Sequence, residues 1–514
     1  MLPALPRLPD LQGLIDRKEY FTLHAPRQSG KTTVMMAAVD SLNEGGAYYA
    51  LYCTLEELCG ITDRAEGMNS LIGILFGSFK SSNAEALKEV AKKDFWTSGT
   101  NSPDYIISPL LVRLRELSAA LDKELIVFFD EADCLAEGPL LSFLSQLRRG
   151  YVERSKTPFP SSIALIGMRN IRDYKIKIRP DSESLGSSSP FNIITEAMTI
   201  ADFTIDQIKE LYSQHTEATG QVFAEEAIQR TWYWSEGQPW LVNALARQVI
   251  NKILNFDSSP IITADYVDTA ADNLMRIRDT HIDSLLARLH EPRVKKFIEP
   301  MLACSKESVF TDKSEEYPSL HDDLQYCLDL GLVKQDPGLR PSNPIYASVI
   351  SRYLNSGLQN SLPPGLIGQW MDGHRLDLTA LLKEFQKFWA ERADRYLSGC
   401  RYLEAAPHSL LTAFLQRVVN GGAIVIEEYA DALGYADIVV KYARKSYVIE
   451  LKIKDNQDSL EASKRQLAAY MDPLLVKEGW LVIFDRMSNK SWSKKISWET
   501  VTMETGQIIH VVNC

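Results

Sequence analysis

The sequence has no apolar run that approaches the roughly 20 residues a transmembrane helix needs. Its first residues, MLPALPRLPDLQ, are interrupted by three prolines and lack a basic region followed by an apolar core, so they do not look like a secretory signal. Both absences exclude a membrane partner from the interpretation. We therefore expect a cytoplasmic protein.

Cysteine is scarce and unpatterned. The seven cysteines are an odd number, are scattered along the chain and include no CxxC pair. This spacing gives no support to a zinc site or to a disulfide framework. It predicts a reducing compartment.

An excess of positive charge is also missing. Lys and Arg number 56 against 67 Asp and Glu, which gives a net charge of −11, so the bulk field does not attract nucleic acid. Residues 365–514 hold 19 basic and 19 acidic residues, and the remaining 37 basic and 48 acidic residues precede them. The acidic excess therefore lies in the first part, and a local basic groove in the last part stays open.

The length of 514 residues predicts about three to four domains. Up to about residue 200, strand-like runs alternate with helical patterns, which predicts an α/β fold with a parallel, doubly wound sheet. Residues 54–107 are longer than one crossover connection needs, and we expect them to hold extra helices or an insertion. The expected strands are Tyr20–Ala25, Ala47–Cys53, Glu124–Phe129 and Ser162–Gly167.

The rest of the chain divides by pattern. Apolar residues recur at helical spacing after residue 201, and later helices are followed by a short Pro-containing strand-like tail, an order that suits a winged helix. The stretch SGLQNSLPPGL, residues 356–366, is the clearest linker. From 401 we expect a helix, three strands, a helix and another strand. The predicted domains are 1–200 (α/β core), 201–278 (helical lid), 279–357 (winged helix), 358–400 (linker and helices) and 401–514.

The strongest local signal is APRQSGKTT, which follows a strand and opens a helix. That context favours a phosphate-binding loop, although Ala25 stands where the G-x-x-x-x-G-K-[ST] pattern has Gly. Lys31 would reach the β- and γ-phosphate oxygens of ATP, and Thr32 would ligate Mg²⁺. The predicted nucleotide-binding residues of the loop are Ala25, Gln28, Ser29, Gly30, Lys31, Thr32 and Thr33.

A second signal is LIVFFDEAD, an apolar strand that ends in two acids. The carboxyl ends of parallel strands are where such sheets bind ligands. Asp130 would hold Mg²⁺, and Glu131 would polarise the attacking water. The same letters occur in helicases, but a helicase motor needs a second parallel α/β domain and residues 202–356 look helical. Arg169, after the fourth strand, is either a γ-phosphate sensor or an ordinary surface arginine.

A different constellation lies in the last block. Asp437 starts one strand, and Glu450 and Lys452 are two apart on the next, so these two share a face. Two carboxylates and a lysine suit a divalent metal, with Asp437 and Glu450 as Mg²⁺ ligands and Lys452 orienting or deprotonating a water. Gln466 and Tyr470 share one face of the following helix. By itself E-x-K more often marks a surface ion pair.

The first 356 residues resemble the STAND-type, AAA-like P-loop ATPases of bacteria. The resemblance is carried by APRQSGKTT, LIVFFDEAD, GMRNIRDYK, SPFNI and GQPWLVN (residues 237–243). It implies that Pro239 on the lid contacts the adenine base, and a proline at the start of a helix is the alternative role. It also implies a winged helix after the lid and allows a homo-oligomer, although no arginine is assigned to a neighbouring site.

The last block resembles the PD-(D/E)xK nuclease superfamily, in the version fused behind AAA-like ATPases. Its matching residues include Glu428, the acid Asp437, the E-L-K of Glu450–Lys452 and the Gln466-x-x-x-Tyr470 helix. Tyr435 stands where that pattern has Arg. The resemblance implies catalytic roles for Asp437, Glu450, Lys452 and Gln466, and a nucleic-acid substrate, with DNA as the first expectation.

Two functions follow from these patterns. The first is an ATPase whose nucleotide state controls a Mg²⁺-dependent nuclease. The second is a nucleotide-dependent switch whose last domain binds nucleic acid or a protein partner without cutting. The balanced charge of residues 365–514 is mild support for the second, because a nuclease usually shows a basic approach to the phosphate backbone.

Overall fold

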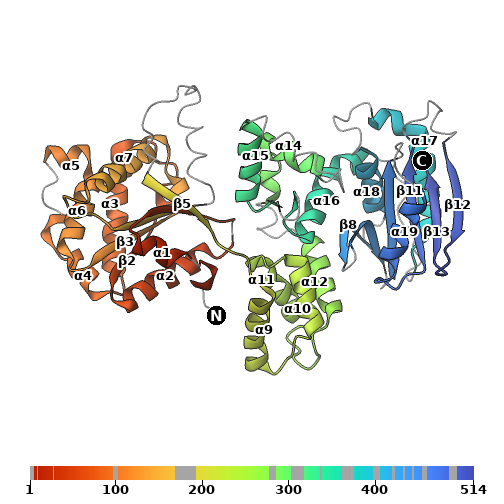
Figure 1. The fold of residues 1–514 in the computed structure, drawn as a ribbon, viewed down its shortest axis with the longest axis horizontal. Coiled ribbons are helices and arrows are strands. Elements are labelled where there is room, and N and C mark those ends of the chain that lie inside the picture. The colour runs from red at the N-terminus through yellow and green to blue at the C-terminus, as the bar shows by residue number, and fades with distance from the viewer. Residues whose placement is uncertain are drawn as a thin grey trace. The chain divides into compact units, whose positions relative to one another are not determined.

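The computed structural model divides the chain into two compact units (Figure 1). Unit 1 comprises Met1–Val222, Gly237–Asn243 and Leu328–Gly331, and unit 2 comprises Phe223–Glu236, Ala244–Cys327 and Leu332–Cys514. The structure describes residues 5–514 except 9, 27, 97–101, 168–192, 277–284, 302–317, 336–338, 362–369, 371–374, 398–405, 419–422, 432–433, 443–444, 454–459 and 486–494.

Unit 1 is built on a five-stranded sheet in the order β2-β3-β4-β1-β5, and every neighbouring pair is parallel. The predicted α/β class and parallel sheet are therefore correct for this unit. β5 was not among the expected strands. The strands are β1 (Tyr20–His24), β2 (Tyr48–Thr54), β3 (Glu124–Asp130), β4 (Ser162–Gly167) and β5 (Ile194–Thr199).

The central strands are buried on both faces. On β3, Leu125, Val127 and Phe129 join one apolar cluster and Ile126 and Phe128 join another, as the two-residue period of a strand requires. A run of apolar residues without alternation is the pattern expected for a parallel strand covered by helices on both sides. This explains why LIVFF forms a strand rather than a surface segment.

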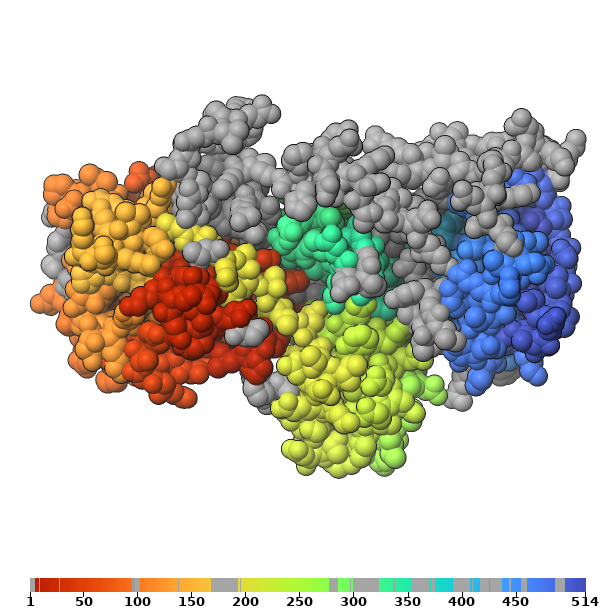
Figure 2. All heavy atoms as spheres, viewed as in Figure 1, coloured from red at the N-terminus to blue at the C-terminus, as the bar shows by residue number. Residues whose placement is uncertain are grey.

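Helices cover both faces of this sheet (Figure 1), and the coloured atoms of this part of the chain, red to light orange in Figure 2, form one continuous surface on the face shown. The extra helices expected between the second and third strands are present. The helical segments of unit 1 are η1 (Leu5–Arg7), α1 (Leu11–Asp16), α2 (Lys31–Gly45), η2 (Glu56–Leu58), α3 (Arg64–Ser81), α4 (Glu85–Ala91), η3 (Asp94–Trp96), α5 (Pro103–Ile107), α6 (Pro109–Ala120), η4 (Ala132–Cys134), α7 (Glu137–Glu153) and α9 (Ile205–Thr219).

The segment predicted as a helical lid is helical, and its helices after α9 lead into unit 2. Further along, two helices are followed by a two-stranded antiparallel ribbon, β6 with β7, and by a long helix. That order is the one expected of a winged helix, and the assignment stays a prediction. The elements are α10 (Glu225–Ser235), α11 (Pro239–Arg247), the π-helical η6 (Gln248–Ile253), α12 (Ala264–Arg276), α14 (Pro292–Met301), α15 (Pro318–Asp329), β6 (Val333–Lys334), β7 (Arg340–Pro341) and α16 (Pro344–Ser361).

The first half of the predicted linker is wrong. α16 runs through Ser361, so the residues SGLQNS at 356–361 continue a helix. Glycine and serine lower helix propensity by only about 1 kcal/mol or less each, which the rest of a long helix can offset. The two prolines that follow at 363 and 364 lie outside the described residues.

The last block forms a six-stranded sheet in the order β12-β13-β11-β10-β9-β8. The expected order of one helix, three strands, a helix and a strand is present, and β12 and β13 extend the sheet beyond it. The elements are α18 (Ala406–Val418), β8 (Ala423–Asp431), β9 (Gly434–Tyr442), β10 (Lys445–Ile453), α19 (Leu460–Met471), β11 (Glu478–Phe484), β12 (Ser497–Thr502) and β13 (Ile508–Asn513).

The predicted boundary at residue 401 is wrong, because α17 (Leu378–Leu397) belongs to this domain. Phe385 of α17 packs edge-on against Phe414 of α18 and against Phe484 of β11, with ring centroids 5.3 and 6.2 Å apart. Trp389 is fully buried in the same cluster. The domain therefore begins before α17, and Trp370 also packs against this cluster.

Across the ranges that the structure describes, no helix combines the length and apolarity needed to cross a bilayer.

Candidate functional site

The loop between β1 and α2 has the backbone of an anion-binding turn. Gln28 and Gly30 have positive φ values of 58° and 86°, and α2 begins at Lys31 directly after them. A left-handed residue at Gly30 favours glycine, since a Cβ there is strained. The loop thus presents the amide groups of a helix N-terminus, where phosphate binds readily.

The Lys31 side chain is buried and is held by this loop. Its Nζ donates to the carbonyl oxygens of Ala25 and Pro26, at 3.0 and 3.2 Å. Ala25 at the first motif position is itself fully buried. The ammonium is therefore placed in the concavity of the loop, while Thr32 and Thr33 are exposed on the first turn of α2.

Asp130 and Thr32 are far apart in the sequence but lie close together in the fold. Thr32 Oγ1 donates to Asp130 Oδ2 at 3.3 Å, although 98 residues separate them. The reason is the sheet order: β4 lies between β1 and β3, and all three end at the same edge. A hydroxyl and a carboxylate at this distance fit Mg²⁺, which takes oxygen ligands and usually keeps several waters and phosphate oxygens besides.

Tyr52 is a site residue that the sequence did not reveal. Its hydroxyl, on β2, donates to Asp130 Oδ2 at 2.6 Å. The register pairs Tyr52 with Phe128 and Thr54 with Asp130, so Tyr52 lies two residues before Asp130's partner. Only knowledge of the β2–β3 register could have identified it.

Glu131 adopts the left-handed conformation, with φ 53°, and its amide donates to Asp130 Oδ1 at 2.9 Å. Burial raises the pKa of its carboxyl group, the neighbouring charges of Asp133 and Asp130 raise it further, and Lys31 opposes the change. Such a carboxylate binds a proton more readily than an exposed glutamate does. This is the direction that a general base acting near neutral pH requires.

Arg7 is a second residue that the sequence missed. It is buried, its Nη2 donates to the carbonyl oxygen of Ser29 at 2.8 Å, and its Nε donates to that of Ala201 at 2.8 Å. Its guanidinium lies 4.9 Å from the ring centre of Phe203. Arg7 therefore fastens the phosphate-binding loop to the segment that leads into α9. It is the only basic residue before Asp16, which was the one available signal.

Pro239 is the first residue of α11, as the helix-start role predicts, and it is buried. Two residues earlier, Gly237 has φ 80°, and a Cβ there would lie 2.0 Å from the carbonyl oxygen of Phe203. The amide of Phe203 donates to the Gly237 carbonyl oxygen at 2.8 Å. This turn is thereby tied to the residue beside Arg7, within unit 1. Adenine contact by Pro239 stays a prediction.

Asp437 and Glu450 lie side by side on β9 and β10. Ile438 pairs with Ile449 in the antiparallel register. One position further along, Asp437 therefore lies opposite Glu450. Both are buried, and the Leu451 amide donates to Asp437 Oδ2 at 2.7 Å. The sequence-predicted pair of carboxylates is thus assembled on one sheet.

Lys452 and Gln466 complete the arrangement. Lys452 Nζ lies 3.4 Å from Glu450 Oε1 and 3.5 Å from Gln466 Oε1. Gln466 Nε2 in turn donates to the Tyr470 hydroxyl at 2.8 Å, across one turn of α19. The lysine therefore links strand to helix, next to the buried acid.

Two carboxylates agree with the one or two that Mg²⁺ usually takes from a protein. Among the described residues, no group of three or more His, Cys, Asp or Glu side chains could hold a metal ion. The side chain of Glu428 lies outside what is described, as does Arg169, the candidate γ-phosphate sensor.

Unit 1 combines a parallel five-stranded sheet, a loop and helix after β1, and paired acids at the end of β3, an arrangement consistent with a P-loop ATPase core. The roles of the individual residues stay predictions.

No protein-family model matches the sequence, and no curated protein matches it. Solved structures that this chain resembles include the Walker-type ATPase PABY2304 of Pyrococcus abyssi, at 18% identity and TM-score 0.47, over 67% of this chain and 94% of that one. They also include the RuvB Holliday junction branch migration motor of Thermotoga maritima, at 13% identity and TM-score 0.33, over 65% and 89%. Cdc6p of Pyrobaculum aerophilum shows 16% identity and TM-score 0.34, over 69% and 93%. TM-scores in this range do not establish membership of any of these families.

Proposed function

We propose that the chain binds and hydrolyses ATP with Mg²⁺ in unit 1, and that its nucleotide state controls a Mg²⁺-dependent nuclease in its last domain. The observation that carries the first half is the 3.3 Å contact between Thr32 and Asp130 beside the lysine of the loop. It joins the two oxygen ligands that the sequence motifs supply separately. Nucleic acid, with DNA first, is the proposed substrate of the second half.

For ATP hydrolysis, the loop amides and Lys31 would hold the β- and γ-phosphates, and Thr32 and Asp130 would hold Mg²⁺. The metal supplies charge neutralisation at the phosphate oxygens. Glu131 would orient the attacking water and accept its proton, a role that its raised pKa supports.

For cleavage, Asp437 and Glu450 would hold Mg²⁺, which supplies activation of water and stabilisation of the leaving oxygen. Lys452 would orient the attacking water, and Gln466 would fix the lysine from the helix side. The 3.4 Å ion pair to Glu450 supports this, because a buried carboxylate keeps a nearby cation in place.

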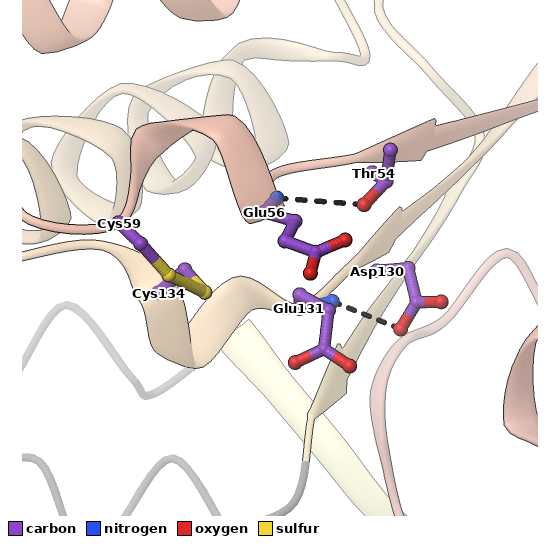
Figure 3. The surroundings of a disulfide bond; sticks show 6 residues. All are labelled: Thr54, Glu56, Cys59, Asp130, Glu131 and Cys134. Atoms are coloured by element: carbon purple, nitrogen blue, oxygen red, sulfur yellow. Dashed lines mark hydrogen bonds between the residues drawn. A yellow bond between two sulfur atoms is a disulfide. The ribbon is translucent and has the colours of Figure 1, made fainter.

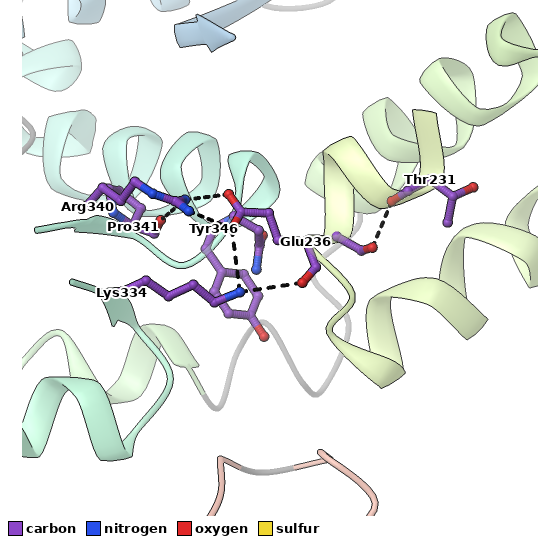
Figure 4. A network of polar contacts seen from close by, with 8 residues as sticks. Thr231, Glu236, Lys334, Arg340, Pro341 and Tyr346 are labelled. Atoms are coloured by element: carbon purple, nitrogen blue, oxygen red, sulfur yellow. Dashed lines mark hydrogen bonds and ion pairs between the residues drawn. The ribbon is translucent and has the colours of Figure 1, made fainter. Parts of the chain in front are cut away.

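Control by nucleotide is supported by a contact network inside unit 2 (Figure 4). Glu236, directly before the turn at Gly237, forms ion pairs with Arg340 of β7 and with Lys334 of β6. The second oxygen of Glu236 accepts from Arg340 Nη2 at 2.8 Å. A change in the conformation of the lid turn would therefore move Glu236, and its ion pairs would pass that movement to the β6–β7 ribbon.

The test measures Mg²⁺-dependent cleavage of linear and circular DNA by the full chain, with and without ATP. Lys452→Ala should lose cleavage and keep ATP hydrolysis. Lys445→Ala is the matched control, because Lys445 is exposed at the start of the same strand. Cleavage by the Lys452 variant at the wild-type rate would reject the catalytic assignment.

A second candidate is the switch without cleavage. One observation favours it: residues 365–514 hold 19 basic and 19 acidic residues, so they lack the excess of positive charge with which a nuclease usually approaches the phosphate backbone. In that case wild type would bind ATP and nucleic acid or a protein, and DNA would stay intact at every Mg²⁺ concentration.

A further inference from the structure

Two cysteines 75 residues apart meet beside the acids of unit 1 (Figure 3). Cys59 and Cys134 form a disulfide, with Cα atoms 4.6 Å apart, inside the range that a disulfide spans. This corrects the expectation from spacing, which gave no sign of a disulfide. Cys59 follows β2 and Cys134 follows β3, and the parallel pairing of those strands brings the two together.

The bond holds the turn that carries Glu131. η4 begins directly after Glu131, and the Cys134 amide donates to the Glu131 carbonyl oxygen at 2.9 Å. On the other side, the Cys59 amide donates to the Glu56 carbonyl oxygen at 3.1 Å. The disulfide therefore joins η4 to η2 at their far ends. It restrains a residue whose left-handed backbone needs support from its surroundings.

Thiol reagents can reach this pair more readily than the other described cysteines. Cys59 is exposed and Cys134 is half-buried, whereas Cys53, Cys327 and Cys514 are buried. Burial raises the pKa of the Cys53 thiol and that of the Cys327 thiol to about 12 each, so both stay protonated and unreactive. Among the cysteines that the structure describes, exchange therefore falls on Cys59 and Cys134.

We propose that Cys59 and Cys134 are a reversible redox pair that takes small thiols and their disulfides as partners, and that its oxidised form sets Glu131 for ATP hydrolysis. In reduction, one thiolate attacks Cys59 Sγ, forms a mixed disulfide and releases Cys134 as a thiol. A second thiolate then attacks the sulfur of the small molecule and releases Cys59. Two electrons pass to the protein, and the two small thiols leave as one disulfide.

The expected effect of reduction on ATP turnover follows from the interactions that each segment keeps once the disulfide is broken. η4 keeps its hydrogen bonds but loses its covalent link to η2, so Glu131 is held less firmly. The phosphate-binding loop lies between β1 and α2 and contains neither cysteine. Reduction should therefore slow turnover and leave nucleotide affinity unchanged. This inference rests on the proposed hydrolysis of ATP.

The experiment uses the full chain equilibrated in glutathione buffers of graded ratio. Differential alkylation and mass spectrometry report the redox state of each cysteine, and kcat and the Kd of a fluorescent ATP analogue are measured in parallel. We expect kcat to fall about tenfold as the pair is reduced, within the roughly 100-fold that a 1 Å misplacement costs. The Kd should stay within about twofold.

Cys59→Ser and Cys134→Ser should both show the reduced rate in every buffer. Cys53→Ala is the control, because Cys53 lies on β2 ahead of Cys59 and outside the pair, and it should respond like wild type. Equal turnover in both redox states, a rise on reduction, or a parallel loss of affinity would each overturn the inference. Absence of turnover in every buffer would reject the proposed ATP hydrolysis, and with it the proposed redox regulation of that hydrolysis.

Discussion

Tyr52 donates a 2.6 Å hydrogen bond to the oxygen of Asp130 that Thr32 also contacts. The neighbouring strand thus fixes the carboxylate that would hold Mg²⁺. Partners of this kind orient metal ligands, and their loss typically costs about 10–100-fold in metal affinity or activity. Tyr52→Phe should therefore raise the Mg²⁺ concentration needed for half-maximal ATP hydrolysis by about tenfold.

Tyr49→Phe is the matched control for this change. Tyr49 lies on the same strand, and its hydroxyl donates to Asp122, away from Asp130. Its Mg²⁺ requirement should equal that of wild type. An equal rise in both variants would point to a general effect on β2 and would remove Tyr52 from the site.

Lys31→Ala should abolish ATP binding. The buried ammonium would be lost from the concavity of the loop, where it lies within 3.2 Å of two carbonyl oxygens. Isothermal titration calorimetry with ATP and Mg²⁺ measures the affinity. Lys80→Ala, on the exposed side of α3, should bind ATP normally. Unchanged affinity in the Lys31 variant would reject the phosphate-binding assignment.

Pro239→Ala tests the lid turn. If Pro239 contacts adenine, the variant should bind ATP a few-fold more weakly, and triphosphate alone should bind with wild-type affinity. The rigid ring at a helix start also lowers the entropy of the unfolded chain, by about 1 kcal/mol or less. Equal ATP affinity for both proteins, with a lower unfolding temperature, would leave only the helix-start role.

Asp272 on α12 predicts a pH-dependent stability. Burial raises its pKa to about 7, and Asp268 adds to the rise. The folded state then binds the proton more tightly than the unfolded state, so this group costs stability progressively as the pH rises from about 4 to 7. Asp272→Asn should be more stable than wild type above pH 7, by up to about 1.4 kcal/mol for each unit of the shift.

At pH 4 the two proteins should unfold at the same denaturant concentration. Asp265 is exposed at the start of the same helix. The stability difference between Asp265→Asn and wild type should therefore not increase with pH. A gain for Asp272→Asn that is constant from pH 4 to pH 8 would mean that packing, and not ionisation, causes it.

Features encoded within a few residues were predictable from the sequence. The strand, loop and helix around Lys31 lie where the motif places them, and the E-x-K pair falls on one strand with Asp437 beside it. Features set by the pairing of distant strands were not predictable. Tyr52 and the Cys59–Cys134 bond depend on how β2 lies against β3, and no local pattern carries that information.

The same reason explains the two boundary errors. A helical apolar pattern shows that α17 has a face to bury, but not which core receives it. Likewise, a Gly- and Ser-containing stretch lowers helix propensity without excluding a helix, so α16 extends to Ser361.

The placement of α17 has a practical consequence for work on the last domain. A fragment cut at residue 401 would remove α17 from Phe414 of α18 and Phe484 of β11, and would expose that apolar area to water. Such a protein would aggregate during expression. A fragment that begins with α16, which packs against α18 and β8, keeps the cover of both α16 and α17, and is the one to purify for crystallisation or for cleavage assays free of the ATPase.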